Sequence, residues 1–154
     1  MRPVVLTDVH LAARLVRSGL LKYYSPEEFQ FLISDIGFDY NYPQTVYNQH
    51  DKSFAERMKK QGFLRVKSFD DTQMTRLYAL FKQFKPKFTI RIVSALLLAQ
   101  MTNATLISED EVLRDVAQIS LISAQNKQWL VGQLVHELAF QGITLDIELV
   151  NELI

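Results

Sequence analysis

The sequence predicts an α/β protein, a three-layer α/β/α sandwich with a mainly parallel sheet. Short β-branched apolar segments alternate with helical patterns along the chain, and this order is typical of parallel βαβ units with right-handed crossovers. Two of these segments, residues 3–7 and 105–107, are each followed at once by acids and an apolar-periodic helix. The 154 residues are 48% hydrophobic, enough to bury a core. We therefore expect one domain over residues 1–154, with residues 125–154 as a C-terminal helical extension.

The first half of the chain contains clear strand patterns and helix boundaries. Residues 25–28 are typical of a helix start, because they combine a capping box with proline at the first helical position. Residues 63–67 alternate apolar and basic side chains, as a half-buried strand does. Gly19 and Gly62 mark helix ends. The expected elements are a strand over 3–7, a helix over 8–18, a short helix over 25–32, a strand within 33–40, a helix from Pro43 to Gly62 and a strand over 63–67.

The second half begins with helical patterns and contains the most hydrophobic segment. Residues 89–101 leave almost no polar face, so we expect a helix buried against the sheet. Ser108 and Glu111 form a second capping box, and Thr144 can cap the last helix. The expected elements are a helix from Asp70 or Asp71 to 84, a helix over 89–101, a strand over 105–107, a helix after 108, a short strand within 119–122, and helices over 129–140 and 144–153.

The composition excludes several classes of protein. The chain has no cysteine, which excludes disulfides, thiolate metal sites and cysteine nucleophiles. No apolar run is long enough to span a membrane. An acid at position 8 interrupts the region where a signal peptide would still be apolar. We expect a cytoplasmic protein without a membrane anchor.

Positive charge is concentrated in the middle of the chain, although the net charge is zero. Residues 52–91 hold eleven basic and three acidic residues. A basic surface can face nucleic-acid phosphates, and solvated helix faces are the alternative interpretation. If the segment binds a nucleic acid, the candidate nucleic-acid-binding residues are Lys82, Lys85, Lys87 and Arg91.

Acidic side chains follow two of the predicted strands. Asp8 follows the first strand, and Glu109, Asp110 and Glu111 follow the strand over 105–107. In open α/β sheets, ligands bind beyond the carboxyl ends of the strands, where the strand order reverses. We expect these two strands to be neighbours at that point, so Asp8 and Asp110 are candidate ligands of a divalent metal ion. Helix capping is the alternative, because acids favour helix N-termini without any metal.

Residues 104–117 resemble a motif of the PIN-domain family. They read Ala-Thr-Leu-Ile-Ser-Glu-Asp-Glu-Val-Leu-Arg-Asp-Val-Ala, where the family has Ala-x-Leu-Leu-Thr-x-Asp-x-x-Leu-Arg-x-x-Ala. The other matching segments are residues 94–99 in the buried helix, Asp8 after the first strand, residues 43–47 at a helix start, and residues 129–130 and 142–144 in the tail of a subgroup related to toxins of bacterial toxin–antitoxin pairs. The resemblance covers nearly the whole chain and depends on the order and spacing of these motifs.

The resemblance implies a divalent-metal-dependent ribonuclease fold. It further implies Mg²⁺ or Mn²⁺ as the cofactor, RNA as the substrate and, for this subgroup, a small antitoxin-like protein partner. Helices beside the active crevice often form dimer contacts in this family. A homodimer is therefore expected as well.

The acid set departs from the family pattern at two positions. The family has a glutamate near the start of the helix after Pro43, where this chain has Gln49 or Asn48. It also has an aspartate in the buried helix, where this chain has Ile92. An isoleucine coordinates nothing, and Gln49 offers at best a neutral carbonyl oxygen. The loss of two carboxylates should weaken metal binding and misplace the attacking water.

Two functions are consistent with this altered acid set. The first is a degenerate PIN-like protein with little or no hydrolytic activity, whose crevice keeps weak binding of metal, RNA or a protein partner. The second is an active Mg²⁺- or Mn²⁺-dependent ribonuclease, in which Asp8 and Asp110 are metal ligands and Gln49 positions water. Arg91 lies beside the lost acid position. It either neutralises the two aspartates in place of the metal or points outward.

Histidines and aromatic residues complete the set of candidates. His10, His50 and His136 show no metal-ligand spacing, and we expect none of them to have a chemical role. A group of aromatic residues near the second strand suits a dimer interface, with core packing as the alternative. This group consists of Phe38, Tyr40, Tyr42 and Tyr47.

Overall fold

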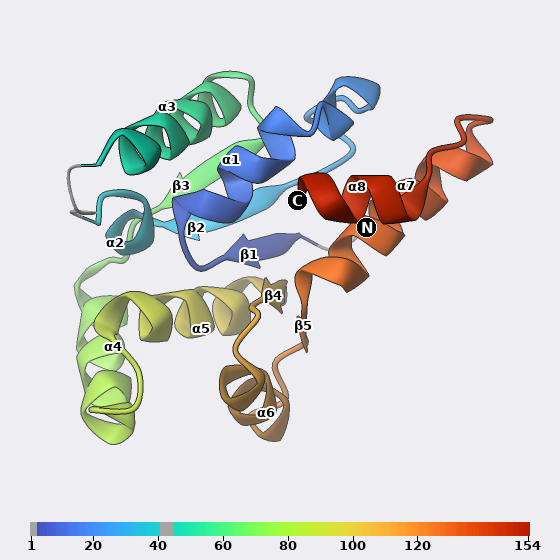
Figure 1. Ribbon diagram of the computed structural model, residues 1–154. Helices are drawn as coiled ribbons and strands as arrows, with labels where there is room; N and C mark the ends of the chain where they lie inside the picture. The colour runs from blue at the N-terminus through green and yellow to red at the C-terminus, as the bar shows by residue number, and fades with distance from the viewer. Residues whose placement is uncertain (1–2, 41–44) are drawn as a thin grey trace.

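The chain folds around a five-stranded parallel sheet with helices on both of its faces (Figure 1). The structure is a computed structural model that describes residues 3–40 and 45–154. The strands are β1 (Val4–Leu6), β2 (Phe31–Ser34), β3 (Leu64–Lys67), β4 (Thr105–Ile107) and β5 (Ala124–Gln125), in the order β3-β2-β1-β4-β5. The expected α/β class and three-layer sandwich are confirmed.

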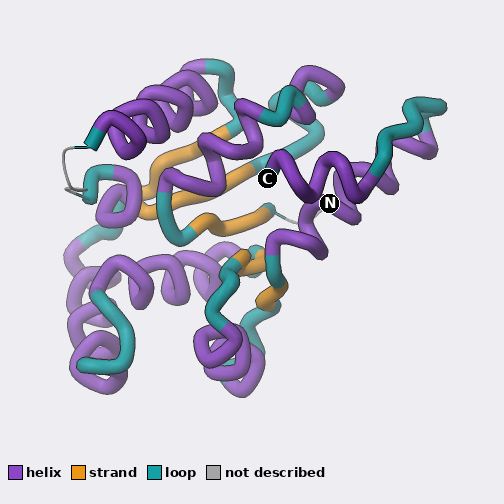
Figure 2. Tube along the Cα trace, viewed as in Figure 1, coloured by secondary structure: helices purple, strands orange, loops and turns teal. Residues whose placement is uncertain are grey.

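The helices connect the strands in the alternating pattern that the sequence predicts. They are α1 (Val9–Arg17), the 3₁₀ helix η1 (Leu20–Tyr23), α2 (Asp35–Phe38), α3 (Val46–Lys60), α4 (Asp71–Phe84), α5 (Ile90–Thr102), α6 (Glu111–Ile119), α7 (Lys127–Phe140) and α8 (Ile147–Leu153). Figure 2 shows the strands between two helical layers. No helix in residues 3–40 and 45–154 has the length and apolar character needed to cross a membrane.

Alternation along each strand divides the core between the two faces of the sheet. Val4 and Leu6 point to the cluster formed with α1, α3, α7 and α8, while Val5 points to the cluster formed with α4, α5 and α6. The strands β1, β2 and β4 are buried on both faces, as is usual for a parallel sheet, whereas the edge strand β3 has exposed residues. Figure 1 shows α1 and α3 on one side of the sheet and α5 and α6 on the other.

The pairing of β1 with β4 determines where a ligand site can form. Val4 pairs with Thr105, and Leu6 pairs with Ile107, so the two strands end at the same level. On its other edge β1 pairs with β2. The connection after β1 leads to β2, at one edge of β1. The connection after β3 leads to β4, at the other edge of β1. The predicted strand neighbours and the reversal of strand order are both confirmed.

Three expected elements differ in their details. Residues 25–32 do not form a helix: Glu28 N–H donates to the Ser25 carbonyl at 3.1 Å in a turn, and β2 already begins at Phe31. Residues 119–122 are not a strand, because backbone hydrogen bonds extend the end of α6 through Leu121. The helix expected from Pro43 is described from Val46, with Thr45 as its N-cap. Tyr42 and Pro43 lie outside the described residues.

Tyr24 connects the chain after η1 to helix α7. Its hydroxyl donates a hydrogen bond to the carbonyl oxygen of Leu134, and its ring packs edge-on against Phe29 with centroids 4.5 Å apart. The Tyr24 side chain is buried, and that burial, followed by the negative charges of Glu137 and Glu28, raises its pKa above 10.0. The hydrogen bond ties α7 to the segment after η1, and the ring packing places Tyr24 against the core residue Phe29.

Substituting Tyr24→Phe should therefore lower the free energy of unfolding by about 1 kcal/mol, the typical net value of one hydrogen bond. The wild-type protein should also lose stability as the pH rises above about 10, because only the unfolded tyrosine then releases its proton. The variant should lack this extra loss. Urea unfolding of both proteins at about pH 8 and about pH 10.5 measures both effects. Equal pH dependence in the two proteins would contradict the assignment.

Candidate functional site

A pocket of about 450 Å³ lies at the carboxyl ends of β1 and β4. Its lining comes from the segments that follow these strands, from α1 and α3, and from the start of α7. The lining residues are Thr7, Asp8, His10, Leu11, Arg14, Asn48, Ile107, Ser108, Glu109, Asp110 and Lys127. The pocket therefore brings Asp8 and Asp110 together, as the strand neighbours predict.

Asp8 is the N-cap of helix α1. Its backbone is extended, and its Oδ1 accepts a hydrogen bond from His10 N–H at 2.9 Å. This is the usual role of an aspartate at a helix start. The cap bond uses Oδ1 and leaves Oδ2 outside it, so the capping interpretation and a place in the pocket are compatible.

Asp110 has the same role at the start of α6. Its Oδ1 accepts hydrogen bonds from Val112 N–H at 3.0 Å and from Leu113 N–H at 3.3 Å. Ser108, which the capping-box pattern favours as the cap, instead accepts the N–H of Asp110 with its Oγ at 3.0 Å. Glu109 accepts the N–H of Lys127 at 2.7 Å and so connects this loop to α7.

Asn48 and Gln49, the two residues at which the resemblance implies a glutamate, lie in the first turn of α3. Asn48 lines the pocket there, and its N–H donates to the Oγ1 of the N-cap Thr45 at 3.1 Å. Gln49 is exposed and is not among the described residues that line the pocket. Successive residues of a helix point about 100° apart, so only one of the two can face the crevice. The sequence pattern alone is consistent with either residue.

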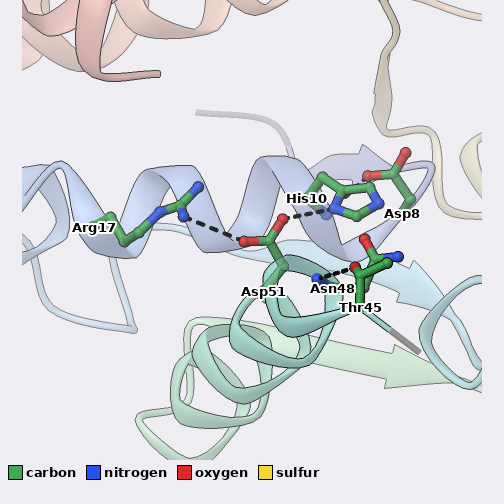
Figure 3. A network of polar contacts seen from close by, with 6 residues as sticks. All are labelled: Asp8, His10, Arg17, Thr45, Asn48 and Asp51. Carbon is green, nitrogen blue, oxygen red and sulfur yellow. Dashed lines mark hydrogen bonds and ion pairs between the residues drawn. The ribbon is translucent and has the colours of Figure 1, made fainter. Parts of the chain in front are cut away.

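A buried ion-pair network lies beside the pocket and was not predicted. Asp51 is fully buried in α3, and its Oδ2 lies 2.6 Å from the Nδ1 of His10. Its Oδ1 lies 3.4 Å from the Nη1 of Arg17 (Figure 3). His10 and Arg17 are seven residues apart, two turns along one face of α1, and this spacing was the only sequence signal for the network.

Two cations line the same pocket as the acids. Arg14 comes from α1, and Lys127 comes from the start of α7. The backbone N–H of Lys127 donates to Glu109, and its Nζ donates to the Ile154 carbonyl at 3.3 Å. The pocket therefore combines carboxylates with positive groups that can attract phosphate and that oppose a metal cation.

The basic residues predicted to hold RNA lie on other surfaces. Lys82, Lys85 and Lys87 are exposed, in α4 and in the segment that leads to α5. The guanidinium of Arg91 lies 4.6 Å from the centroid of the Tyr40 ring. None of these four basic residues is among the described residues that line the pocket. Their role in binding RNA stays a prediction.

The aromatic residues predicted to form a dimer interface differ in how deeply they are buried. Phe38 is buried in the core, whereas Tyr40 is 47% exposed. Tyr42 lies outside the described residues. A homodimer stays a prediction.

The pocket contains carboxylate oxygens, which are of the kind that Mg²⁺ and Mn²⁺ bind, and binding of such an ion stays a prediction. Asp8 and Asp110 use Oδ1 for capping, and one or two carboxylates together with water and substrate phosphate can hold Mg²⁺. Within the described part of the chain, no group of three histidine, aspartate or glutamate side chains is placed to hold a metal ion. The donor set is therefore smaller than that of a strong site.

Among the comparisons with known proteins, the search of solved structures found matches, whereas the sequence comparisons did not. No family model matches the sequence, and no curated protein matches it. The solved structure of a PilT N-terminus domain protein, SSO1118 from the hyperthermophilic archaeon Sulfolobus solfataricus P2, has a TM-score of 0.56 and 18% identity. The match covers 88% of this chain and 94% of that one. FitAB bound to an IR36 DNA fragment matches with a TM-score of 0.48 and 14% identity, over 80% of this chain and 94% of that one. The likeness to SSO1118 shows that this chain has the fold of PilT N-terminus (PIN) domains.

Proposed function

We propose that this PIN-fold protein binds RNA at its crevice and has little or no metal-dependent hydrolytic activity. The observation that carries the proposal is the composition of the pocket at the ends of β1 and β4. Asp8 and Asp110 each cap a helix there, Asn48 stands in the first turn of α3, and the cations Arg14 and Lys127 line the same space.

This composition disfavours phosphodiester hydrolysis for an electrostatic reason. Metal-assisted hydrolysis needs an ion that activates water and neutralises the charge developing on the phosphate. The affinity of an oxygen site for such an ion depends on the number of charged ligands. Asn48 adds an oxygen without charge, and Ile92 packs against the apolar core on the α5 side of the sheet. The cations nearby further reduce the attraction of the pocket for a divalent ion.

The same cations support binding of a phosphate backbone. Arg14 offers a planar guanidinium, which suits bidentate contact with phosphate oxygens. Lys127 approaches from α7 and adds a second positive group to the pocket. The exposed residues Lys82, Lys85 and Lys87 offer a further basic surface for a longer strand. Phosphate contacts of this kind give affinity without sequence specificity.

A Mg²⁺ or Mn²⁺ ion, when bound, would supply Lewis-acid chemistry at the crevice. Asp8 and Asp110 would hold it, and Asn48 would orient water through its side-chain amide. An active ribonuclease is therefore the second candidate function. The observation that favours it is that both aspartates line one pocket at the ends of adjacent, in-register strands.

A binding assay on labelled single-stranded RNA tests the proposal. Fluorescence anisotropy with Mn²⁺ present should show salt-dependent binding, and a denaturing gel of the same samples should show intact RNA. The Lys82→Gln/Lys85→Gln/Lys87→Gln variant should bind more weakly. The slope of log affinity against log salt should fall by about 0.7 for each phosphate that no longer meets a lysine.

The matched control substitutes two exposed lysines on a different helix. Lys59→Gln/Lys60→Gln in α3 removes positive charge from another surface and should bind RNA nearly as the wild type does. No binding by the wild type would contradict the RNA-binding proposal. Mn²⁺-dependent cleavage that is lost in Asp8→Asn would establish the second candidate instead.

A further inference from the structure

We propose that the Tyr78 ring stacks on an unpaired base of RNA, while Lys82 and Lys85 on the same side of α4 contact the phosphates of that strand. The inference rests on the proposed RNA-binding function. It adds that the α4 surface is selective for single-stranded RNA over double-stranded RNA. Figure 1 shows α4 at the edge of the helical layer that also contains α5 and α6.

Helix α4 buries one face and leaves Tyr78 outside it. Leu77 is fully buried, and Met74 and Phe81 pack against the same apolar cluster on the α5 side of the sheet. Tyr78 is not part of that cluster, and 52% of its surface is exposed. Within the described residues, the Tyr78 side chain makes no hydrogen bond and no contact with another ring. The ring is therefore accessible to a ligand.

Two lysines follow Tyr78 along the same side of the helix. Lys82 lies four residues after Tyr78, and Lys85, the C-cap residue, lies seven after it, which correspond to about one and two helical turns. At 1.5 Å per residue, the three side chains are spread over about 10 Å of the helix axis. The acids of this segment, Asp70 and Asp71, lie at the opposite end of α4.

Both lysines are available to phosphate groups. Their side chains are exposed, and in residues 3–40 and 45–154 neither of them forms an ion pair. An unpaired ammonium group at the surface can exchange its counterion for an RNA phosphate. The α4 surface therefore places a free aromatic ring directly beside two free positive charges.

This combination suits single-stranded RNA. Proteins that bind single strands use positive groups along the backbone and aromatic side chains on which bases stack. In a duplex the base faces are already stacked on one another, so a tyrosine at the surface meets only the backbone and the groove. Tyr78 should therefore contribute to the binding of single strands and not of duplexes. Because every base has a stacking face, we expect little sequence preference.

Substituting Tyr78→Leu tests the inference by fluorescence anisotropy with labelled single-stranded RNA. Leucine keeps an apolar side chain and a high helix propensity but removes the aromatic face. The affinity should fall about tenfold, as expected for the loss of one base stack. The slope of log affinity against log salt should not change, because no charge is removed. Tyr78→Phe, which retains the ring, should bind as the wild type does.

Two altered ligands separate stacking from other effects of the substitution. The first is an abasic oligonucleotide of the same length, which keeps the phosphates and lacks the bases. The second is double-stranded RNA. The wild type and Tyr78→Leu should bind each of these ligands equally well. An equal loss of affinity for the abasic strand would show that Tyr78 acts through the backbone or the fold, which would overturn the inference.

Phe140→Leu is the matched control. Phe140 is another exposed aromatic residue, 82% exposed at the end of α7, where Glu137 rather than a lysine precedes it by one turn. This variant should bind single-stranded RNA as the wild type does, and an equal loss in Phe140→Leu would overturn the inference.

The same assay distinguishes failure of the inference from failure of the proposed function. If the wild type binds single-stranded RNA and Tyr78→Leu binds it equally tightly, base stacking on Tyr78 is refuted and RNA binding stands. If the wild type binds no RNA, the proposed function is refuted, and base stacking is refuted with it.

Discussion

Substituting Asn48→Glu is expected to tighten Mn²⁺ binding about tenfold, because it adds a third charged oxygen ligand to a site that has two. Asn48 lines the pocket together with Asp8 and Asp110. A carboxylate in its place also balances the positive charge of Arg14 and Lys127. RNA cleavage with Mn²⁺ should rise above the wild-type level. Calorimetry and a cleavage assay on the same preparations measure the two effects.

Gln49→Glu is the matched control for this gain. It adds the same charge one residue further along α3, but Gln49 is exposed and is not among the described lining residues. We expect little change in Mn²⁺ affinity, because a point charge at the surface is screened by salt. Equal gains from the two substitutions would mean that the added charge acts at long range. The assignment of Asn48, rather than Gln49, to the position of the family glutamate would then be wrong.

Removing both side-chain partners of Asp51 is expected to have the largest effect on stability. In the His10→Leu/Arg17→Met variant, a fully buried carboxylate would lose its two ion-pair partners. Leaving one buried charge uncompensated typically costs about 3–5 kcal/mol. The free energy of unfolding should fall by about that amount, as measured by urea denaturation. Protection of α3 amides from hydrogen exchange should fall with it, since Asp51 joins α3 to α1.

A third substitution distinguishes two causes of the stability loss, the uncompensated buried charge and the loss of side-chain packing. Adding Asp51→Leu to the double variant replaces the whole network by apolar side chains, a change that is often neutral or stabilising. Stability should return to within about 1 kcal/mol of the wild type if the uncompensated carboxylate causes the loss. If the triple variant is as unstable as the double one, the network contributes through shape and packing instead.

The arrangement of the sheet could be predicted because its signals are local. Residues 105–107 form β4 within the predicted bounds, and the short strand at the N-terminus pairs with it as expected. The buried helix follows from its lack of a polar face, and α5 extends over 90–102. The helix predicted from residues 25–28 is absent, because serine, proline and glutamate also suit a turn. Phe31 instead belongs to β2, which pairs with β1.

The pocket could be predicted only in part, because its details depend on helix phase and on long-range packing. Asp8 and Asp110 follow from the strand order alone. The choice between Asn48 and Gln49 depends on how α3 is rotated against the sheet, which no local pattern determines. Asp51 contacts a histidine 41 residues away in the sequence. A single buried aspartate in an otherwise polar segment looks like a surface residue until its partners are known.

RNA cleavage by the wild-type protein, compared with the Asp8→Asn/Asp110→Asn variant, tests the central claim most directly. Both proteins would be incubated with labelled single-stranded RNA and Mn²⁺, and the products separated on a denaturing gel. We predict that the wild type cleaves no faster than the variant, because two capping aspartates and an asparagine do not form an efficient hydrolytic site. Mn²⁺-dependent cleavage by the wild type that disappears in the variant would contradict this account.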